Sequence, residues 1–132
     1  MSLSLPIQGL RVLVVDDSKT IRRTAQTLLQ KEGCEVFVAE NGFDALAKIV
    51  EYQPQLIFID IMMPRLDGYH ACALIRSNST FKNTPIIMLS SKDGLFDRAK
   101  ARVVGANYYL TKPFSQDELK KALTLTLSQA DH

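Results

Sequence analysis

The chain has 132 residues, of which 46% are hydrophobic and 23% are charged, and its formal net charge is +2 at pH 7. These fractions are typical of one globular domain, and the near-balance of charge argues against a nucleic-acid-binding protein. A membrane-spanning helix and a signal peptide are not expected, because the apolar runs are short. We therefore expect a cytoplasmic protein with one domain over residues 1–132, a core from about residue 9 to 127, and no output domain.

The two cysteines, Cys34 and Cys72, have neither C-x-x-C spacing nor histidine ligands beside them. A zinc site or a disulfide framework is therefore not expected, and both thiols are predicted to be reduced core residues. His70 and His132 are predicted to lie on the surface.

Five short apolar runs rich in β-branched residues predict five strands. Three of the runs are almost continuously apolar, which is typical of parallel strands buried on both faces. The runs cover residues 12–15, 36–39, 56–59, 86–89 and 108–110.

The segments between and after these runs have the apolar spacing of helices. Gly33 and Gly105 are placed to end two of them, and Ser115 with Glu118 forms a capping box before the last. A weaker third helix is expected over residues 68–76. The other four predicted helices rest on the apolar spacing of these residues: Ile21, Ala25, Leu28 and Leu29; Phe43, Leu46, Ala47 and Val50; Leu95, Ala99 and Val103; Leu119, Ala122, Leu123 and Leu127.

Strict alternation of strand and helix predicts an α/β fold of the doubly wound type, with a five-stranded parallel sheet and helices on both faces. In such sheets a ligand binds outside the carboxyl ends of the strands. The residues that follow each predicted strand are therefore the candidates for function.

Polar side chains follow four of the five predicted strands. Asp16 and Asp17 follow the first strand, Asp60 the third, Ser90 the fourth and Lys112 the fifth. Clustered carboxylates repel one another, and oxygen ligands without imidazole or thiolate favour Mg²⁺. A lysine and a hydroxyl opposite the ion would bind phosphoryl oxygens, which leaves one carboxylate free to act as a nucleophile.

Each of these residues also has an ordinary structural interpretation. Asp16, Asp17 or Ser18 is suited to capping the helix that follows, Lys112 to a solvated loop, and Ser90 to a turn. Their joint placement at four strand ends favours the functional interpretation.

The motifs VLVVDDS, FIDIMMPRLDGY, IIMLSS and YYLTKPF resemble those of two-component response regulator receiver domains, the CheY-like family, over residues 9–127. The resemblance implies a flavodoxin-like (βα)5 fold with strand order 2-1-3-4-5. It also implies a signalling protein whose only catalysis is self-dephosphorylation. Asp60 would be the phosphoacceptor, and Asp16, Asp17, Asp60 and the backbone carbonyl of Met62 would hold Mg²⁺.

The same resemblance assigns roles at the ends of the last two strands. Ser90 and Lys112 would bind the phosphoryl group, and Ser90 with Tyr109 would form the conformational switch. The peptide bond between Lys112 and Pro113 would be cis.

Within the family, the strings TIRRTAQTLL, FDALAKI, ACALIR and MLSSKDGLFD are most similar to regulators of twitching-motility chemosensory systems. This similarity implies a CheA-like histidine kinase as phosphodonor and a role in type IV pilus motility. A downstream partner is expected on the fourth helix, fifth strand and fifth helix, with Arg98, Lys100 and Arg102 as contacts. Met62 and Lys92 depart from the chemotaxis regulator beside the path of an attacking water, so we expect a long-lived phosphoaspartate.

Three alternative functions fit the sequence less well than a receiver does. A Mg²⁺-dependent phosphatase with an aspartyl nucleophile needs an acidic residue two positions after that nucleophile, where this chain has Met62. A nucleotide-binding or flavin-binding module needs a glycine-rich turn after the first strand, where this chain has carboxylates. A pseudo-receiver scaffold would bind partners without phosphorylation, in which case Asp60→Asn would leave its activity unchanged.

Overall fold

The computed structural model describes residues 7–91 and 94–129, and in these ranges five strands alternate with five helices. The expectations for Lys92 and His132 fall outside the described residues. The strands are β1 (Arg11–Val15), β2 (Glu35–Ala39), β3 (Leu56–Asp60), β4 (Ile86–Ser90) and β5 (Tyr108–Thr111). The helices are α1 (Lys19–Lys31), α2 (Gly42–Tyr52), α3 (Gly68–Ser77), α4 (Leu95–Val103) and α5 (Gln116–Gln129).

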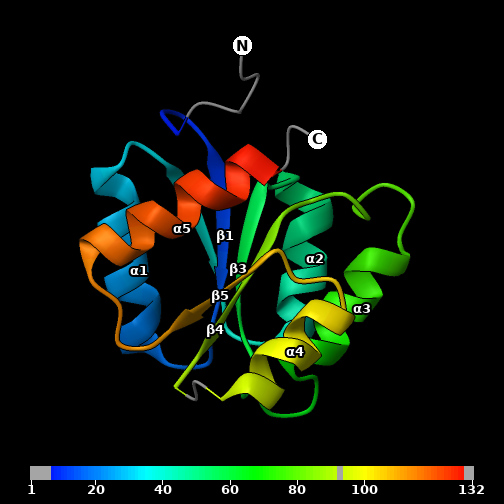
Figure 1. Cartoon of the computed structure of the whole chain (residues 1–132). Coiled ribbons are helices and arrows are strands. Elements are labelled where there is room, and N and C mark those ends of the chain that lie inside the picture. The colour runs from blue at the N-terminus through cyan, green and yellow to red at the C-terminus, as the bar shows by residue number, and fades with distance from the viewer. Residues whose placement is uncertain (1–6, 92–93, 130–132) are drawn as a thin grey trace.

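The strands form one parallel sheet in the order β2-β1-β3-β4-β5. Figure 1 shows the sheet in the middle of the molecule, with helices on either side. This is the predicted doubly wound fold with the flavodoxin-like order. Every residue of β3 and β4 is buried, whereas the edge strands β2 and β5 are only partly buried. The continuous apolar runs therefore mark the interior strands, as expected.

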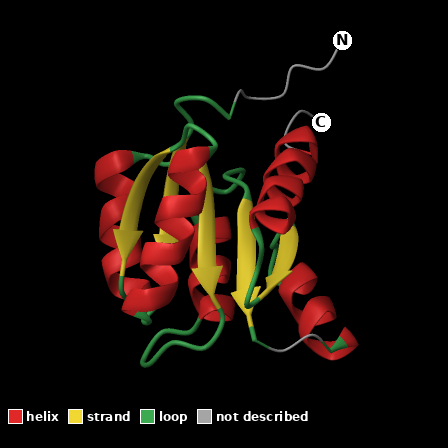
Figure 2. Ribbon diagram, turned by 90° about the vertical axis from the view of Figure 1, so that its left-hand side faces the viewer, coloured by secondary structure: helices red, strands yellow, loops and turns green. Residues whose placement is uncertain are grey.

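Helices cover both faces of the sheet (Figure 2). Helices α1 and α5 pack over one apolar cluster, which includes Ala25 and Leu29 from α1 and Leu123 from α5. Helices α2, α3 and α4 pack over the other, which includes Ile49, Cys72 and Ala101. The parallel strands place all five of their carboxyl ends at one edge, where the polar residues gather.

The predicted helix boundaries are confirmed by backbone geometry and hydrogen bonds. Gly33 (φ 94°) and Gly105 (φ 102°) follow the ends of α1 and α4 in the left-handed region, which favours glycine. Glu118 N–H donates to Ser115 Oγ at 3.1 Å, and Ser115 N–H donates to Glu118 Oε1 at 3.0 Å, so the capping box precedes α5. Ser18 caps α1 by accepting from Ile21 N–H at 3.3 Å.

The apolar stripes that predict the helices are buried in α5 and in large part in α1, but they are mostly exposed in α2 and α4. In α2, Phe43 is 55% and Val50 65% exposed, and the helix instead buries Ala45 and Ile49. In α4, Leu95 and Val103 are 87% and 84% exposed, and Ala101 is the buried residue. Both helices carry apolar residues on more than one face, and each places an alanine against the sheet, where a small side chain allows close approach.

Both cysteines are buried and free, as predicted. Burial raises the pKa of each thiol to about 11, which keeps both in the unreactive protonated form at neutral pH. His70 is exposed, also as predicted. Within residues 7–91 and 94–129, every helix falls short of the length and hydropathy that a bilayer span requires.

Candidate metal and phosphoryl site

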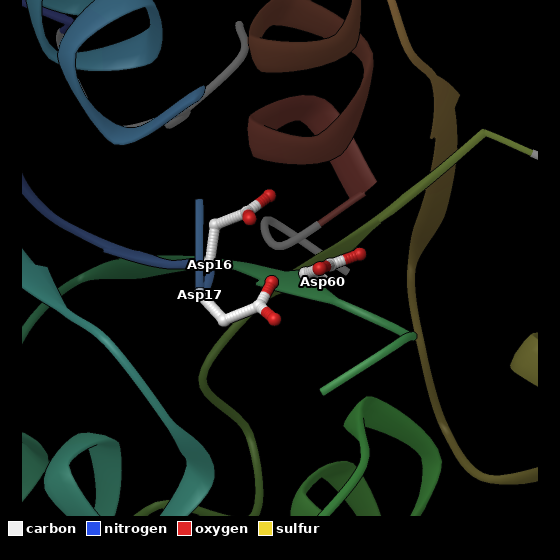
Figure 3. A group of neighbouring side chains, drawn as sticks. All are labelled: Asp16, Asp17 and Asp60. Carbon is white, nitrogen blue, oxygen red and sulfur yellow. The ribbon is translucent and has the colours of Figure 1, made fainter. Parts of the chain in front are cut away.

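The ends of β1 and β3 bring three carboxylates together, as Figure 3 shows. One oxygen from each of Asp16, Asp17 and Asp60 lies within 4.8 Å of the others. Asp16 and Asp60 are buried, at 0% and 3% exposure, whereas Asp17 is exposed. The cluster that the sequence predicts is therefore present, with one carboxylate open to solvent.

Local hydrogen bonds fix the acidic turn after β1. Oδ1 of Asp16 accepts from Ser18 N–H at 2.9 Å, so the aspartate is held by the turn while Ser18 caps α1. The guanidinium of Arg22 donates to the backbone carbonyl of Asp16 at 2.7 Å. Of the candidates for capping α1, Ser18 takes the role, and Asp17 is left with its carboxylate toward the site. Sequence analysis missed Arg22, because one arginine in a helix gives no signal of its own.

Lys112 joins the two buried aspartates. Its ammonium nitrogen lies 3.1 Å from Oδ2 of Asp16 and 3.1 Å from Oδ1 of Asp60. The backbone sets this position, because Lys112 follows β5 directly and its N–H donates to the carbonyl of Ser90 at 2.7 Å. The Lys112–Pro113 peptide bond is cis, as expected. Lys112 is thus a bridging cation and not a solvated loop residue.

The carboxylates of the site carry more negative charge than Lys112 alone can balance. Burial raises the pKa of Asp60 to about 6 and the charge of Asp16 adds to this, while Lys112 and the Met62 amide oppose it. Burial alone would lower the pKa of Lys112, but the charges of Asp60 and Asp16 outweigh burial and raise it. The site therefore favours one further positive charge near the carboxylates.

The loop between β3 and α3 follows Asp60 directly and fixes its position. The amide of Met62 donates to Oδ1 of Asp60 at 3.3 Å, and the Gly68 amide donates to the Ile61 carbonyl at 3.0 Å. A Cβ on Gly68 would lie 2.4 Å from the Asp60 carbonyl oxygen, so only glycine allows α3 to start this close to the strand. Met62 itself is 60% exposed. A metal-binding role for its carbonyl remains a prediction.

Ser90 and Tyr109 occupy different environments. Ser90 ends β4, is 2% exposed and lines a cleft of about 540 Å³ together with Asp17 and Met62. Tyr109 is 7% exposed in β5, and the Arg98 guanidinium carbon lies 5.0 Å from its ring centroid. Ser90 is therefore placed beside the carboxylates, whereas Tyr109 is covered by α4.

The basic residues of α4, Arg98, Lys100 and Arg102, are exposed, and two of them also contact tyrosines. Besides Arg98, the Lys100 ammonium lies 4.4 Å from the ring centroid of Tyr69, a buried residue of α3. The Tyr69 hydroxyl donates to the Asp97 carbonyl at 3.3 Å. These contacts connect α3 to α4, and they could not be predicted from the sequence, because they join residues that are far apart in the chain.

The donor set fits Mg²⁺. Carboxylate oxygens are the ligands this ion prefers, the group lacks histidine and thiolate ligands, and the exposed Asp17 leaves one side open for water or substrate. The raised pKa of Asp60 is the further sign that the cluster lacks positive charge. Asp16, Asp17 and Asp60 would hold the ion here.

Similarity to curated proteins agrees with this site. The chain is 69% identical over 115 residues to Protein PilG of Pseudomonas aeruginosa. That match covers 87% of this chain and 85% of PilG. It is 41% identical over 121 residues to the probable transcriptional regulator ycf27 of Pyropia yezoensis. That match covers 92% of this chain but 49% of ycf27, so the chain spans about half of that longer relative.

Solved structures agree as well. The chemotaxis response regulator CheY4 of Vibrio cholerae superposes with a TM-score of 0.86 at 36% identity, over 91% of this chain and 100% of CheY4. The receiver domain of Francisella response regulator 1452 superposes with a TM-score of 0.81 at 36% identity, over 89% of this chain and 97% of that domain. The profile of the response regulator receiver domain matches residues 12–124. The chain therefore belongs to the response regulator receiver domain family.

Proposed function

We propose that this chain is a receiver that accepts a phosphoryl group on Asp60 and thereby switches its binding to a partner. The observation that carries this proposal is the placement of Asp60, a buried carboxylate with Lys112 at 3.1 Å and with Asp16 and Asp17 beside it. The pattern offers a nucleophile, a cation for the phosphoryl oxygens and an oxygen-ligand set for Mg²⁺.

In the proposed reaction a carboxylate oxygen of Asp60 attacks phosphorus and forms an acyl phosphate. The bond between phosphorus and the donor, a phosphohistidine nitrogen or an acyl-phosphate oxygen, breaks in the same step, and the donor leaves with that electron pair. Oδ1 of Asp60 already accepts from Lys112 and the Met62 amide, so we assign the attack to Oδ2. Mg²⁺, when bound, would neutralise charge on the phosphoryl oxygens.

Lys112 and Ser90 would then hold the transferred group. Lys112 can exchange its contact with Oδ1 of Asp60 for a phosphoryl oxygen while it keeps Asp16. The Ser90 hydroxyl lies at the end of the neighbouring strand and would donate to another phosphoryl oxygen. The movement of Ser90 toward the phosphate would give Tyr109 room to rotate.

Self-dephosphorylation is the hydrolysis of the phosphoaspartate, with water as the nucleophile. Water would attack phosphorus, Asp60 would leave as a carboxylate, and inorganic phosphate would be released. Met62 is 60% exposed and lines the same cleft as Asp17 and Ser90, so its apolar side chain would limit the approach of water. We propose a correspondingly long-lived phosphoaspartate.

The 69% identity with PilG supports a finer assignment. We propose a cytoplasmic regulator of type IV pilus motility whose phosphodonor is a CheA-like histidine kinase. The partner surface on α4, β5 and α5 is supported by the exposure of Leu95, Phe96 and Val103. Arg98 and Arg102 line a cleft of about 690 Å³ on the same surface.

Phosphotransfer from purified histidine kinases of the source organism tests this function. Each kinase is first labelled with radioactive phosphate and then mixed with the wild-type chain or Asp60→Asn in the presence of Mg²⁺. We expect rapid transfer from one CheA-like kinase to the wild type and none to the variant. Transfer from none of the kinases, or partner binding that is the same in Asp60→Asn, would favour the pseudo-receiver scaffold. Turnover of a generic phosphomonoester would favour the phosphatase.

A further inference from the structure

An apolar surface lies on α2 and α3, on the opposite side of α3 from α4. Phe43 and Val50 of α2 are 55% and 65% exposed, and Leu74 of α3 is 47% exposed. Ala47 is exposed between the two α2 residues. Helices α2 and α3 contact each other and lie side by side in Figure 1. We call Phe43, Ala47, Val50 and Leu74 the α2–α3 patch.

The contacts of α2 show which way its exposed residues face. Lys48 donates to the Val38 carbonyl and Tyr52 stacks on Phe37 at 4.2 Å, so this side of the helix faces the edge strand β2. Residues two apart in a helix lie on nearly opposite sides. Val50 therefore lies on the side of α2 that faces α3.

The contacts of α3 place Leu74 on the matching side. Tyr69 donates to Asp97, and Arg76 donates to the Gly105 carbonyl at 2.9 Å, so this side of α3 faces α4 and the loop after it. Leu74, two residues before Arg76, points away from α4 and toward α2. The exposed apolar residues of the two helices thus form one continuous surface and not isolated exposures.

Two leucines lie beneath the α2–α3 patch. Leu46 and Leu66 are partly buried and pack against the core cluster beneath α2 and α3. A Cβ on Gly42 would lie 2.8 Å from the Leu66 side chain, so this leucine sits directly on the first turn of α2. Soluble proteins seldom leave such contiguous apolar surface uncovered unless it binds something.

Acidic residues border the patch on the α2 side. Asp44 and Glu51 lie on the helix and the exposed Glu40 precedes it, while Lys48 is the one cation that the sequence of α2 contains. The Lys48 ammonium is turned toward Val38 and lies 3.4 Å from Asp44. The border therefore presents negative charge to a partner.

We propose that the α2–α3 patch binds an amphipathic helix of another protein, with large apolar side chains on one face and lysine or arginine along its edge. Charge complementarity favours this occupant over a second copy of the chain. A two-fold antiparallel pairing of α2 helices through the patch would set the acidic borders of both copies along the same side, where they repel. The site is separate from the phosphorylation chemistry and does not depend on it.

Chemical-shift mapping on the uniformly nitrogen-15-labelled full chain tests the proposal. The probe is a synthetic helix of about 18 residues, roughly five turns, with a leucine stripe bordered by lysines. We expect saturable shift changes at the amides of Phe43, Ala47, Val50 and Leu74. A matched peptide with glutamate in place of each lysine should bind the patch more weakly.

Variants decide whether the patch and its charge cause the binding. Val50→Asp should weaken binding at the patch amides at least tenfold, roughly the effect of losing one buried valine side chain. Val103→Asp, at an exposed apolar position on α4, should leave the patch affinity unchanged. Glu51→Lys should reverse the preference between the lysine and glutamate peptides without removing apolar area.

Several results would overturn the proposal. They are shift changes confined to α4 and α5, equal effects of Val50→Asp and Val103→Asp, or no change in peptide preference with Glu51→Lys. Sedimentation that shows a dimer which Val50→Asp dissociates would assign the patch to a second copy instead.

Discussion

The ammonium of Lys112 lies 3.1 Å from Oδ1 of Asp60. The lysine follows β5 and the aspartate ends β3, with β4 between them in the sheet. The same nitrogen lies 3.1 Å from Oδ2 of Asp16, so one cation serves two buried carboxylates. This arrangement leaves the cluster with net negative charge, which favours a further cation beside it.

Replacement of Lys112 by methionine removes the one cation bound to both buried aspartates. We expect Lys112→Met to lower the free energy of unfolding by about 3 kcal/mol without Mg²⁺, because it leaves buried carboxylates without their partner. Saturating Mg²⁺ should reduce this loss, because the ion supplies positive charge to the same oxygens. Urea unfolding with and without Mg²⁺ measures both effects.

Lys120→Met, on the exposed side of α5, is the matched control and should change stability by less than about 0.5 kcal/mol. Equal losses for the two variants would show that the bridge contributes no stability.

The raised pKa of Asp60 predicts an unusual pH dependence of stability. The folded-state pKa is about 6, above the ordinary value of 3.8, so ionised Asp60 destabilises the metal-free fold. The penalty is fully present above pH 6 and disappears as the pH falls through 6 toward 4. In EDTA, Asp60→Asn should therefore be more stable than the wild type at pH 7.5.

Urea unfolding of both proteins across this pH range measures the difference between them. We expect the advantage of Asp60→Asn to shrink steadily on acidification to pH 4.5. A difference that stays constant with pH would mean that Asp60 has an ordinary pKa.

Asp17 gives a test of the metal site that leaves the fold intact. Its side chain is exposed, so Asp17→Asn should change metal-free stability by less than about 0.5 kcal/mol. The loss of one of three carboxylate ligands should weaken Mg²⁺ binding about tenfold or more, and with it the stabilisation that Mg²⁺ provides. Calorimetric titration and thermal unfolding at several Mg²⁺ concentrations measure these effects.

Glu35→Gln serves as the control. It removes an exposed carboxylate at the start of β2, whereas the acidic cluster lies at the edge of the sheet where the strands end. If both variants bound Mg²⁺ as the wild type does, the carboxylate cluster would not be the metal site.

The fold and most of the site could be predicted from sequence because each rests on a local pattern. Continuous apolar runs identify the interior strands β3 and β4, and parallel strands bring the residues after them to one edge. Asp16, Asp17, Asp60 and Lys112 were therefore predictable as a cluster.

What could not be predicted depends on three-dimensional packing. The exposed apolar stripe that includes Phe43 and Val50 has the same spacing as a buried face, so periodicity alone selects the wrong side of α2. Arg76 is a second example, since its guanidinium donates to the Gly105 and Thr84 carbonyls and to Asn107 Oδ1. Such contacts join residues far apart in the chain and leave no local signal.

Gly68 tests the dependence of the site on close backbone approach. A Cβ there would lie 2.4 Å from the Asp60 carbonyl oxygen and 2.8 Å from the Ile61 Cα, so Gly68→Ala must displace the turn that presents Asp60. We expect a stability loss of roughly 1–3 kcal/mol and at least tenfold slower phosphorylation by acetyl phosphate.

Gly94→Ala is the comparison, because among the described residues its Cβ would meet the flexible Asp97 carboxylate, at 3.1 Å. Its phosphorylation rate should stay within about twofold of wild type. An equally fast Gly68→Ala would show that the turn tolerates the displacement.

Met62 tests the proposed long life of the phosphoaspartate. Its exposed apolar side chain lines the cleft beside Asp60, and Met62→Asn replaces it with a polar group that can position water. We expect dephosphorylation several-fold faster than wild type, with Met62→Leu unchanged. Loss of label after rapid removal of acetyl phosphate measures both rates. A wild-type lifetime of seconds, or equal rates for all three proteins, would contradict the shielding role.

Asp60 is proposed to receive the phosphoryl group, and this can be tested directly by locating that group on the chain. The wild type is incubated with acetyl phosphate and Mg²⁺, reduced with borohydride to trap the acyl phosphate, and sequenced by tandem mass spectrometry. We predict one modified residue, Asp60, no modification in Asp60→Asn, and strongly reduced modification in EDTA. Modification at another residue, or an unmodified Asp60 under conditions that phosphorylate a known receiver, would contradict the account.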